Sequence, residues 1–457
     1  MKKNLIITSV KTLLIIFSVL LIRSLQSDSI NDTLSKVYTS SPLLKSQRFE
    51  LEALNEDLAK ALSNKRPKVN LYGTIGADKT KTVSTSKIES TKNNNPKSIS
   101  LEISQNIYDS GKNSFNISKT DALIFAQRAE LMKEEQKVLL EAVHIYLNLL
   151  AAYEINKLAR KNSDVLKQNL EATKSRFQVG EATSTDLSLA KARYMSGKSD
   201  EIRSIGNVEK EKSKYFSMIG EEAPKKLFFP KENFSIPNSL KSIINATIKN
   251  NPEIIANGFK KKSSYFDISM AITDLLPKLD LNLSAQNAWA PNTFFEEYEN
   301  YKLELSLKVP LYQGGNNYSN IRKKKKEAIQ IGELLNYTIK KLIKEAELLW
   351  IELKSLESQI KSVSATINAN QLALEGVKKE AEVGTRTLLD ILDAEQEVLE
   401  ERVELIKARK DKFYTLYSLM EKIGKLNPSD LQLSVKNYNY DKSYNSVKKM
   451  WLGFEDN

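Results

Sequence analysis

The chain has 457 residues, enough for two or three domains, and it contains no cysteine, which excludes disulfides, thiolate metal sites and a thiol nucleophile. Its formal net charge is +12, but the basic residues lie in amphipathic patterns beside many acids, which indicates solvated helix faces rather than a nucleic-acid-binding surface. The single histidine, His144, lies in a helical pattern, and no phosphate loop, HExxH or GxSxG motif is present. We therefore expect no enzyme and no bound cofactor or metal.

The first 27 residues have the pattern of a secretory signal peptide. Lys2 and Lys3 precede an apolar run from Leu13 to Ile22, and polar sequence follows. The apolar run is short for a membrane-spanning helix, so we expect residues 1–27 to be a signal peptide, with an uncleaved anchor helix as the alternative. Without cysteine, the N-terminal lipid of a bacterial lipoprotein is excluded.

A first repeat is predicted over residues 41–220, with a helix at 41–66, a strand hairpin at 67–108 and a long helical hairpin at 112–219. Apolar residues alternate on both sides of a loop at Lys79–Lys97 that we expect to be polar and flexible. Between Gly111 and Gly180 lie 68 residues without glycine or proline. At about 1.5 Å per residue they predict a helix of roughly 100 Å.

An inter-repeat segment at 221–250 leads to a second repeat over 251–424, with a helix at 252–276, a strand hairpin at 277–312 and a helical hairpin at 316–423. A tail follows at 425–457. Landmarks of the first repeat recur here in the same order: IYDSG at Ile107–Gly111 returns as LYQGG at Leu311–Gly315, 204 positions later. A fixed order with a constant offset indicates internal duplication.

The strands of the second repeat alternate strictly between apolar and polar residues. Leu279, Leu281 and Leu283 alternate with polar residues, and so do Leu303 and Leu305. Strands of about ten residues can cross a bilayer when tilted. Their polar sides carry charges that a dry core would not accept but a water-filled lumen would, namely those of Asp280, Lys302, Glu304 and Lys308. A soluble hairpin with one wet face is the alternative.

The same turn is written twice. QVGEATSTDLSLAK begins at Gln178 and EVGTRTLLDILDAE at Glu382, and their shared residues are Gly180 and Gly384, Thr183 and Thr387, Asp186 and Asp390, and Ala190 and Ala394. Each glycine can take the positive φ that ends a helix, and we place the caps of the next helices at Thr185, Asp186 and Thr387. The turn does not explain why Asp393 follows Asp390 on one helix face.

With these motifs the chain resembles the TolC-like outer membrane efflux and type I secretion channels of Gram-negative bacteria. The resemblance extends from about Ser41 to Leu426 and is carried by PLYQGG at Pro310–Gly315 and above all by VGTRTLLDILDAE at Val383–Glu395. It implies a homotrimer with four strands per chain, a 12-strand transmembrane β-barrel in the outer membrane and a long α-helical coiled-coil barrel in the periplasm. The segments 221–250 and 425–457 would form an equatorial collar.

The resemblance also implies a passive, gated export duct. Its partners would be a periplasmic adaptor protein, an inner-membrane transporter of the ABC or RND type and outer membrane lipid, which the basic run Arg322–Lys326 could meet unless it is simply a solvated helix start. A soluble periplasmic coiled-coil scaffold and the adaptor itself are the alternatives. The matched strand hairpins argue against a scaffold, and an adaptor would have one helical hairpin rather than two.

In the family the helix turns form the gate. Asp390 and Asp393 would line the constriction as acidic rings that favour cations, and crowding would raise the pKa values of their carboxyl groups. Arg386 would reach Thr185 and Asp186 of the first turn and hold the entrance closed. Ala381 stands where the best-known member has a tyrosine that takes part in this link, and Phe177 is the corresponding residue of the first repeat. We therefore expect the link to be weaker or built differently.

Overall fold

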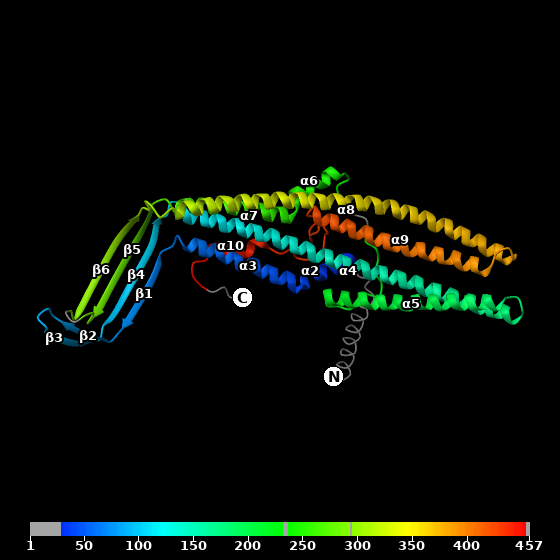
Figure 1. Ribbon diagram of the computed structural model, residues 1–457, viewed down its shortest axis with the longest axis horizontal. Coiled ribbons are helices and arrows are strands. Elements are labelled where there is room, and N and C mark those ends of the chain that lie inside the picture. Colours follow the sequence, from blue (N-terminus) through cyan, green and yellow to red (C-terminus); the bar gives the residue numbers. More distant parts are fainter. Residues whose placement is uncertain (1–28, 232–235, 293–294, 454–457) are drawn as a thin grey trace, which may run out of the picture. The chain divides into compact units, whose positions relative to one another are not determined.

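A computed structural model of the chain describes residues 29–231, 236–292 and 295–453, which form two compact units (Figure 1). Unit 1 contains the described residues up to Ser46, Met132–Pro252 and Ile339–Asn437. Unit 2 contains Gln47–Leu131, Glu253–Thr338 and the described residues from Tyr438 onward. The predicted signal peptide at 1–27 lies outside the described residues.

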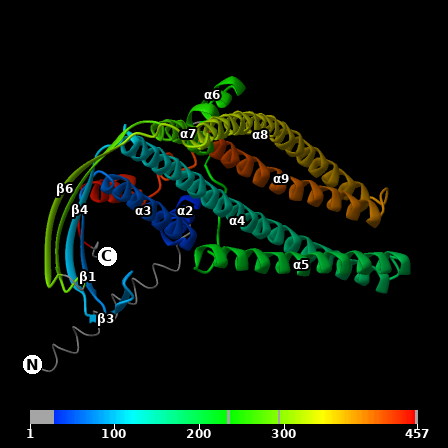
Figure 2. The same ribbon diagram turned by 60° about the vertical axis from the view of Figure 1, so that its left-hand side comes forward.

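Unit 2 contains a four-stranded antiparallel sheet, in which the strands lie side by side in the order β1-β4-β5-β6 (Figure 2). The strands are β1 (Lys68–Ile75), β4 (Lys97–Tyr108), β5 (Lys278–Trp289) and β6 (Glu297–Lys308). Leu101 of β4 lies opposite Ala285 of β5, and Ile103 lies opposite Leu283, so the central strand pair joins the two halves of the chain. Within the described residues, β1 and β6 are the two edges of this sheet.

The segment at Lys79–Lys97 is polar, as predicted, but the prediction of a flexible loop is wrong because most of the segment is regular secondary structure. It contains a second hairpin, β2 (Asp78–Val83) and β3 (Glu89–Asn94), which forms a separate two-stranded sheet. Lys81 and Glu89 form an ion pair across it at 2.8 Å. The segment is polar, but it contains four threonines together with Val83 and Ile88, and such β-branched residues favour extended backbone.

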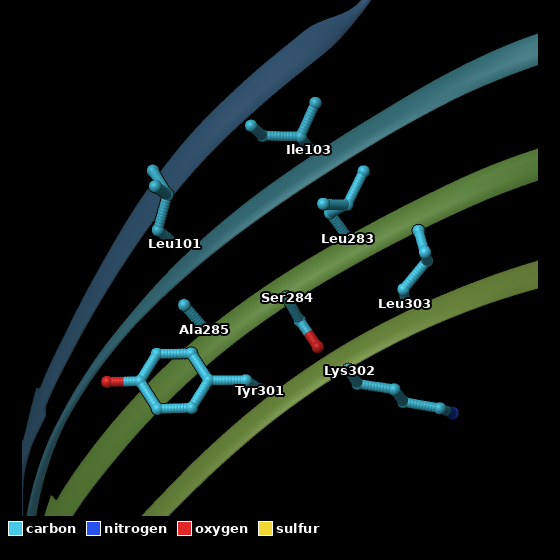
Figure 3. Close-up of a pocket in the computed structure, with 8 residues that line it drawn as sticks. All are labelled: Leu101, Ile103, Leu283, Ser284, Ala285, Tyr301, Lys302 and Leu303. Carbon is cyan, nitrogen blue, oxygen red and sulfur yellow. The ribbon is translucent and has the colours of Figure 1, made fainter.

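The alternation along the strands gives the four-stranded sheet one apolar and one polar face. Figure 3 shows apolar side chains from three strands around a shallow hollow of the apolar face: Leu101, Ile103, Leu283, Ala285, Tyr301 and Leu303. On the polar face, Asn106 donates a hydrogen bond to Asp280 at 2.7 Å, and Lys302 pairs with Glu304. The apolar face is largely uncovered in the chain, since Leu303 is 70% exposed.

The remaining elements are helices, and two of them are 67 residues long. They are α2 (Ile30–Ser40), α3 (Pro42–Ser63), α4 (Lys112–Gln178), α5 (Ser184–Ile219), α6 (Leu240–Asn250), α7 (Pro252–Thr273), α8 (Asn316–Glu382), α9 (Leu388–Lys422) and α10 (Tyr440–Lys449). The long helices α4 and α8 each contribute their first part to unit 2 and their second part to unit 1. The predicted sequence patterns did not include α2, α6 or α10.

An apolar core around the middle of α4 holds unit 1 together. Val143, Leu147 and Leu150 of α4 are buried together with Tyr215 of α5 and Tyr417 of α9. The segment between the repeats packs on the same core through buried Leu227 and Ile243. Its backbone is also fixed, because the hydroxyl of Tyr146 donates to the carbonyl of Phe228 at 3.0 Å.

Unit 2 has a smaller core between α3 and α4, on which the C-terminal tail packs. Leu51 and Leu58 of α3 are buried against Ile124 and Leu131 of α4, and Tyr438, Tyr440 and Tyr444 of the tail cover them. Among the described helices, α4 is the one long and apolar enough to cross a membrane by length and composition, but 56% of its apolar window is buried within the protein. Such burial is typical of a core helix.

Two glycines at the ends of the helical hairpins provide a matched test of packing. Gly220 and Gly424 have similar positive φ angles, 81° and 74°. A Cβ atom on Gly424 would lie 2.3 Å from the carbonyl oxygen of Asn250, whereas no atom lies within 4 Å of a Cβ on Gly220. Left-handed backbone strain of about 1–2 kcal/mol is common to both positions.

We therefore expect Gly424→Ala to lower the unfolding temperature more than Gly220→Ala, because only the former adds a clash with backbone. Thermal unfolding followed by circular dichroism measures the difference. Equal losses for the two variants would contradict the close approach of residue 250 to the end of α9.

Candidate functional site

Each long helix ends at the glycine of the repeated turn. Gly180 and Gly384 have φ angles of 82° and 81°. In both turns the glycine N–H and the following N–H donate to two carbonyls of the last helical turn: Gly180 to Phe177 (3.1 Å) and Glu181 to Arg176 (2.8 Å), and Gly384 to Ala381 (3.1 Å) and Thr385 to Glu380 (3.0 Å). This is the Schellman ending, which requires left-handed backbone where glycine stands.

The threonine and aspartate of each turn form a capping box at the start of the next helix. Thr183 is the N-cap of α5, and its hydroxyl accepts the N–H of Asp186 at 3.1 Å. The carboxylate of Asp186 in turn accepts the hydroxyl of Thr183 at 2.7 Å and its N–H at 2.9 Å. Thr387 and Asp390 repeat the arrangement at the start of α9, with corresponding distances of 3.3, 2.8 and 2.8 Å.

These contacts correct the predicted cap positions in the first turn. The cap is Thr183, not Thr185 or Asp186, because in a capping box the acid stands three residues after the cap. The same rule explains why the turn occurs twice. A glycine that ends one helix, a threonine three positions later that caps the next helix, and an aspartate three positions after that are what each helix reversal needs.

The cap also lowers the pKa of the aspartate in each turn. The backbone N–H and then the hydroxyl of Thr387 stabilise the carboxylate of Asp390 and lower its pKa, and the charge of Arg386 acts in the same direction. The backbone and hydroxyl of Thr183 lower the pKa of Asp186 in the same way. In the single chain the pKa of Asp390 is therefore lowered, because hydrogen-bond donors surround the charged form. The raised pKa expected for carboxylates crowded between three copies stays a prediction.

Asp393 has a different partner. It forms an ion pair with Arg193 of α5. Arg193 was not among the residues predicted from the sequence. The two turns differ here, because the position of Asp393 in the second turn corresponds to Leu189 in the first. That difference could have indicated that Asp393 has a partner of its own. Arg386 does not reach Thr185 or Asp186 within the described chain: its Nε donates to Glu380 of its own turn at 2.8 Å.

A second contact lies beside this ion pair. Glu395, whose side chain is only 9% exposed, pairs with Lys378 of α8 at 2.7 Å. It also accepts a hydrogen bond from Asn169 of α4 at 3.2 Å. Together with Arg193 and Asp393 these residues join α4, α5, α8 and α9, and we call the five of them the charged layer.

The described residues contain no group of three or more His, Cys, Asp or Glu side chains that could hold a metal ion. His144 packs edge-on against Tyr414 with ring centres 5.0 Å apart, and burial lowers the pKa of its imidazole. The interactions that the structure shows at the turns are ion pairs and helix caps.

Comparison with known proteins gives similarity over most of the chain. A model of the family described as outer membrane efflux protein matches residues 33–211 and 243–425. The outer membrane efflux protein BepC of Brucella suis biovar 1 (strain 1330) is 25% identical over 428 residues, which are 93% of this chain and 92% of BepC. The outer membrane protein TolC of Escherichia coli (strain K12) is 24% identical over 426 residues, 89% of this chain and 84% of TolC.

The fold is also that of a solved channel. The Campylobacter jejuni CmeC outer membrane channel superposes with a TM-score of 0.78 at 18% identity, covering 92% of this chain and 89% of that chain. The two ranges matched by the family model fall within the two halves that the repeated landmarks define, apart from a few residues at their ends.

The lowered pKa of Asp390 predicts how the cap responds to acid. A carboxyl group whose pKa is depressed in the folded state stabilises the fold above its unfolded pKa, about 3.9 for aspartate. That stabilisation is lost as the pH falls through the lower, folded value. The Thr387 amide donates to this carboxylate, so we expect it to keep its hydrogen-exchange protection down to about pH 4 and to lose it below.

The control is Asp390→Asn, in which the protection should be weaker and should not vary with pH over this range. Protection is measured relative to the exchange rate of unstructured chain at each pH. Loss of protection already above about pH 5 would contradict the cap, because it would reveal the raised pKa of crowded carboxylates.

Proposed function

The chain belongs to the outer membrane efflux protein family, and we propose that three copies of it close one 12-strand barrel and one helical tunnel. The protein is an outer membrane exit duct for efflux or secretion and extends into the periplasm. The trimer, the gate at the helix turns and the docking partners are parts of the proposal.

The four-stranded sheet carries the proposal. Its edges, β1 and β6, have no partner strand within the described chain. In lipid, unpaired backbone groups cost several kcal/mol each, so a sheet that spans a membrane must close on itself. Four strands are too few to close, but β6 of one copy can pair with β1 of the next, and three copies with four strands each remove every edge.

The two faces of the sheet fit lipid outside and water inside. Leu71, Leu303 and Leu305 are 67%, 70% and 62% exposed on the apolar face, where hydrocarbon would cover them. Asp280 and Lys302 on the other face suit a water-filled lumen. A soluble scaffold would instead leave the apolar face in water, which monomeric soluble proteins avoid.

We place the gate at the helix turns, with Asp390, Asp393, Arg386, Thr185 and Asp186 as its residues. The glycine ends and capping boxes make each turn a stiff unit, so opening would move whole helical hairpins rather than unwind the turns. Both cap bonds to Asp186 use Oδ2, so Oδ1 is available to accept a further donor. Arg386 of a neighbouring copy would supply it by exchanging Glu380 for Asp186 and Thr185.

Docking partners would bias this equilibrium between closed and open hairpins. The proposed partners, which the sequence resemblance implies, are a periplasmic adaptor protein and an inner-membrane transporter of the ABC or RND type that supplies the energy. The segments 221–250 and 425–457 would form a collar around the helical tunnel. The duct itself would be passive.

The absence of cysteine makes the closure of the barrel directly testable. Opposite residues of paired strands have Cα atoms about 4.5–5.5 Å apart, within reach of a disulfide. We expect Leu71→Cys on β1 to cross-link with one of Leu303→Cys, Leu305→Cys or Leu307→Cys on β6, giving covalent dimers and trimers on a non-reducing gel and no larger species.

The control combines Leu101→Cys with the same β6 variants. Leu101 lies on β4, whose neighbours on both sides belong to the same chain, so no intermolecular bond should form. A ladder that continues beyond the trimer, or no cross-link from any β1–β6 pair in folded protein, would contradict the three-copy barrel.

A further inference from the structure

The ion pair between Arg193 and Asp393 joins helices that belong to different halves of the chain. Arg193 lies on α5 and donates through its Nη2 to Oδ1 of Asp393 on α9. Their side chains are 37% and 53% exposed. We propose that Arg193 is a positioning residue of the gate: it clasps α5 to α9 in the closed duct and neutralises Asp393 until the duct opens. This inference rests on the duct proposed above.

The rest of the charged layer shows why this pair would release first. The side chain of Glu395 is largely buried and has partners on both α4 and α8, so moving α9 away from these helices would have to break two contacts of one carboxylate. The Arg193–Asp393 pair is half exposed, and water can solvate both groups once they part. The contact of α9 with α5 is therefore the reversible one, and its contacts with α4 and α8 are the permanent ones.

α5 and α9 share the apolar core of unit 1 at Tyr215 and Tyr417, but they have little apolar packing between that core and the clasp. A groove between α4, α5 and α9 is lined largely by polar side chains, including Asp200 and Asn207 of α5 and Glu400 and Glu404 of α9. Such a wet groove adds little to hold the two helices together. Near the turns, the ion pair therefore supplies much of the attraction between α5 and α9.

The clasp also determines which acids a passing ion meets. The carboxylate of Asp390 is held by the cap of α9, and that of Asp393 is paired with Arg193. In the closed duct the Asp393 carboxylates would thus be neutralised, and breaking the clasp would expose them. A ring of free carboxylates favours cations. Ion selectivity therefore reports the state of the clasp independently of the size of the opening.

Substitution of Arg193 separates these effects. In the full-length trimer in planar bilayers, Arg193→Gln should raise both the conductance and the preference for cations over anions, because Asp393 is set free. Asp393→Asn should raise the conductance without raising the cation preference. An exposed pair of this kind shifts the ratio of open to closed hairpins by roughly two- to fivefold per chain.

A charge swap and a matched control complete the experiment. Arg193→Asp combined with Asp393→Arg should restore the low conductance that either change alone abolishes. Lys198→Gln removes a cation from the same helix with similar exposure, but Lys198 pairs with Glu201 of its own helix, so the currents should equal those of the wild type.

The outcomes distinguish the clasp from the duct. Wild-type currents from Arg193→Gln, or a charge swap that restores nothing although the trimer is folded, would overturn the clasp and leave the duct standing. No current from any folded trimer, the wild type included, would overturn the duct and the clasp with it.

Discussion

Backbone groups at the edge of a β-sheet need partners, and a hydrocarbon layer offers none. This constraint organises the molecule. Each chain presents four strands with two open edges and an apolar face that nothing in the described residues covers. Closing the edges between copies satisfies the backbone, places the apolar face in lipid and encloses the polar face in one step. In the proposed barrel, oligomerisation would follow from the number of strands in a chain rather than from any special contact between subunits.

The helical hairpins solve a different problem, which is to reverse a long helix in a reproducible shape. The chain solves it twice with the same residues: a glycine stop, a threonine cap and an aspartate that closes the capping box. Residues that the two turns share are therefore needed for shape. Residues in which the two turns differ are not needed for that shape and can serve the proposed gate. Asp393 is such a residue, because the first turn has Leu189 at the same position, and it pairs with Arg193.

Much of this architecture could be predicted from the sequence because it is periodic. Alternation marked the four strands of the main sheet, and 68 residues without glycine or proline marked α4. The polar composition of residues 79–97 predicted an irregular loop, but the β-branched residues within it, mostly threonine, favour the hairpin of β2 and β3. The strand prediction to residue 312 was also too long, because Pro310 cannot donate a ladder hydrogen bond and β6 ends at Lys308.

The site was harder to predict because its contacts depend on distance in space. Thr387 and Asp390 could be recognised from the sequence as parts of one turn. The lowered pKa of Asp390 could not, because it results from hydrogen bonds with Thr387 and not from the number of nearby acids. Arg193 and Asp393 are 200 residues apart, and only the packing of α5 against α9 brings them together. Arg386 pairs with Glu380, six residues away in the sequence, and this contact competes with the predicted contact to Thr185 and Asp186.

The central claim is that copies of this chain enclose a water-filled path through lipid. Recording the current through a planar bilayer that contains the purified wild-type trimer tests it most directly. Small, discrete current steps, each from the insertion of one trimer, are the predicted result, since the proposed gate would keep the entrance narrow when no partner is docked. A folded trimer that enters the bilayer and passes no current would contradict the account.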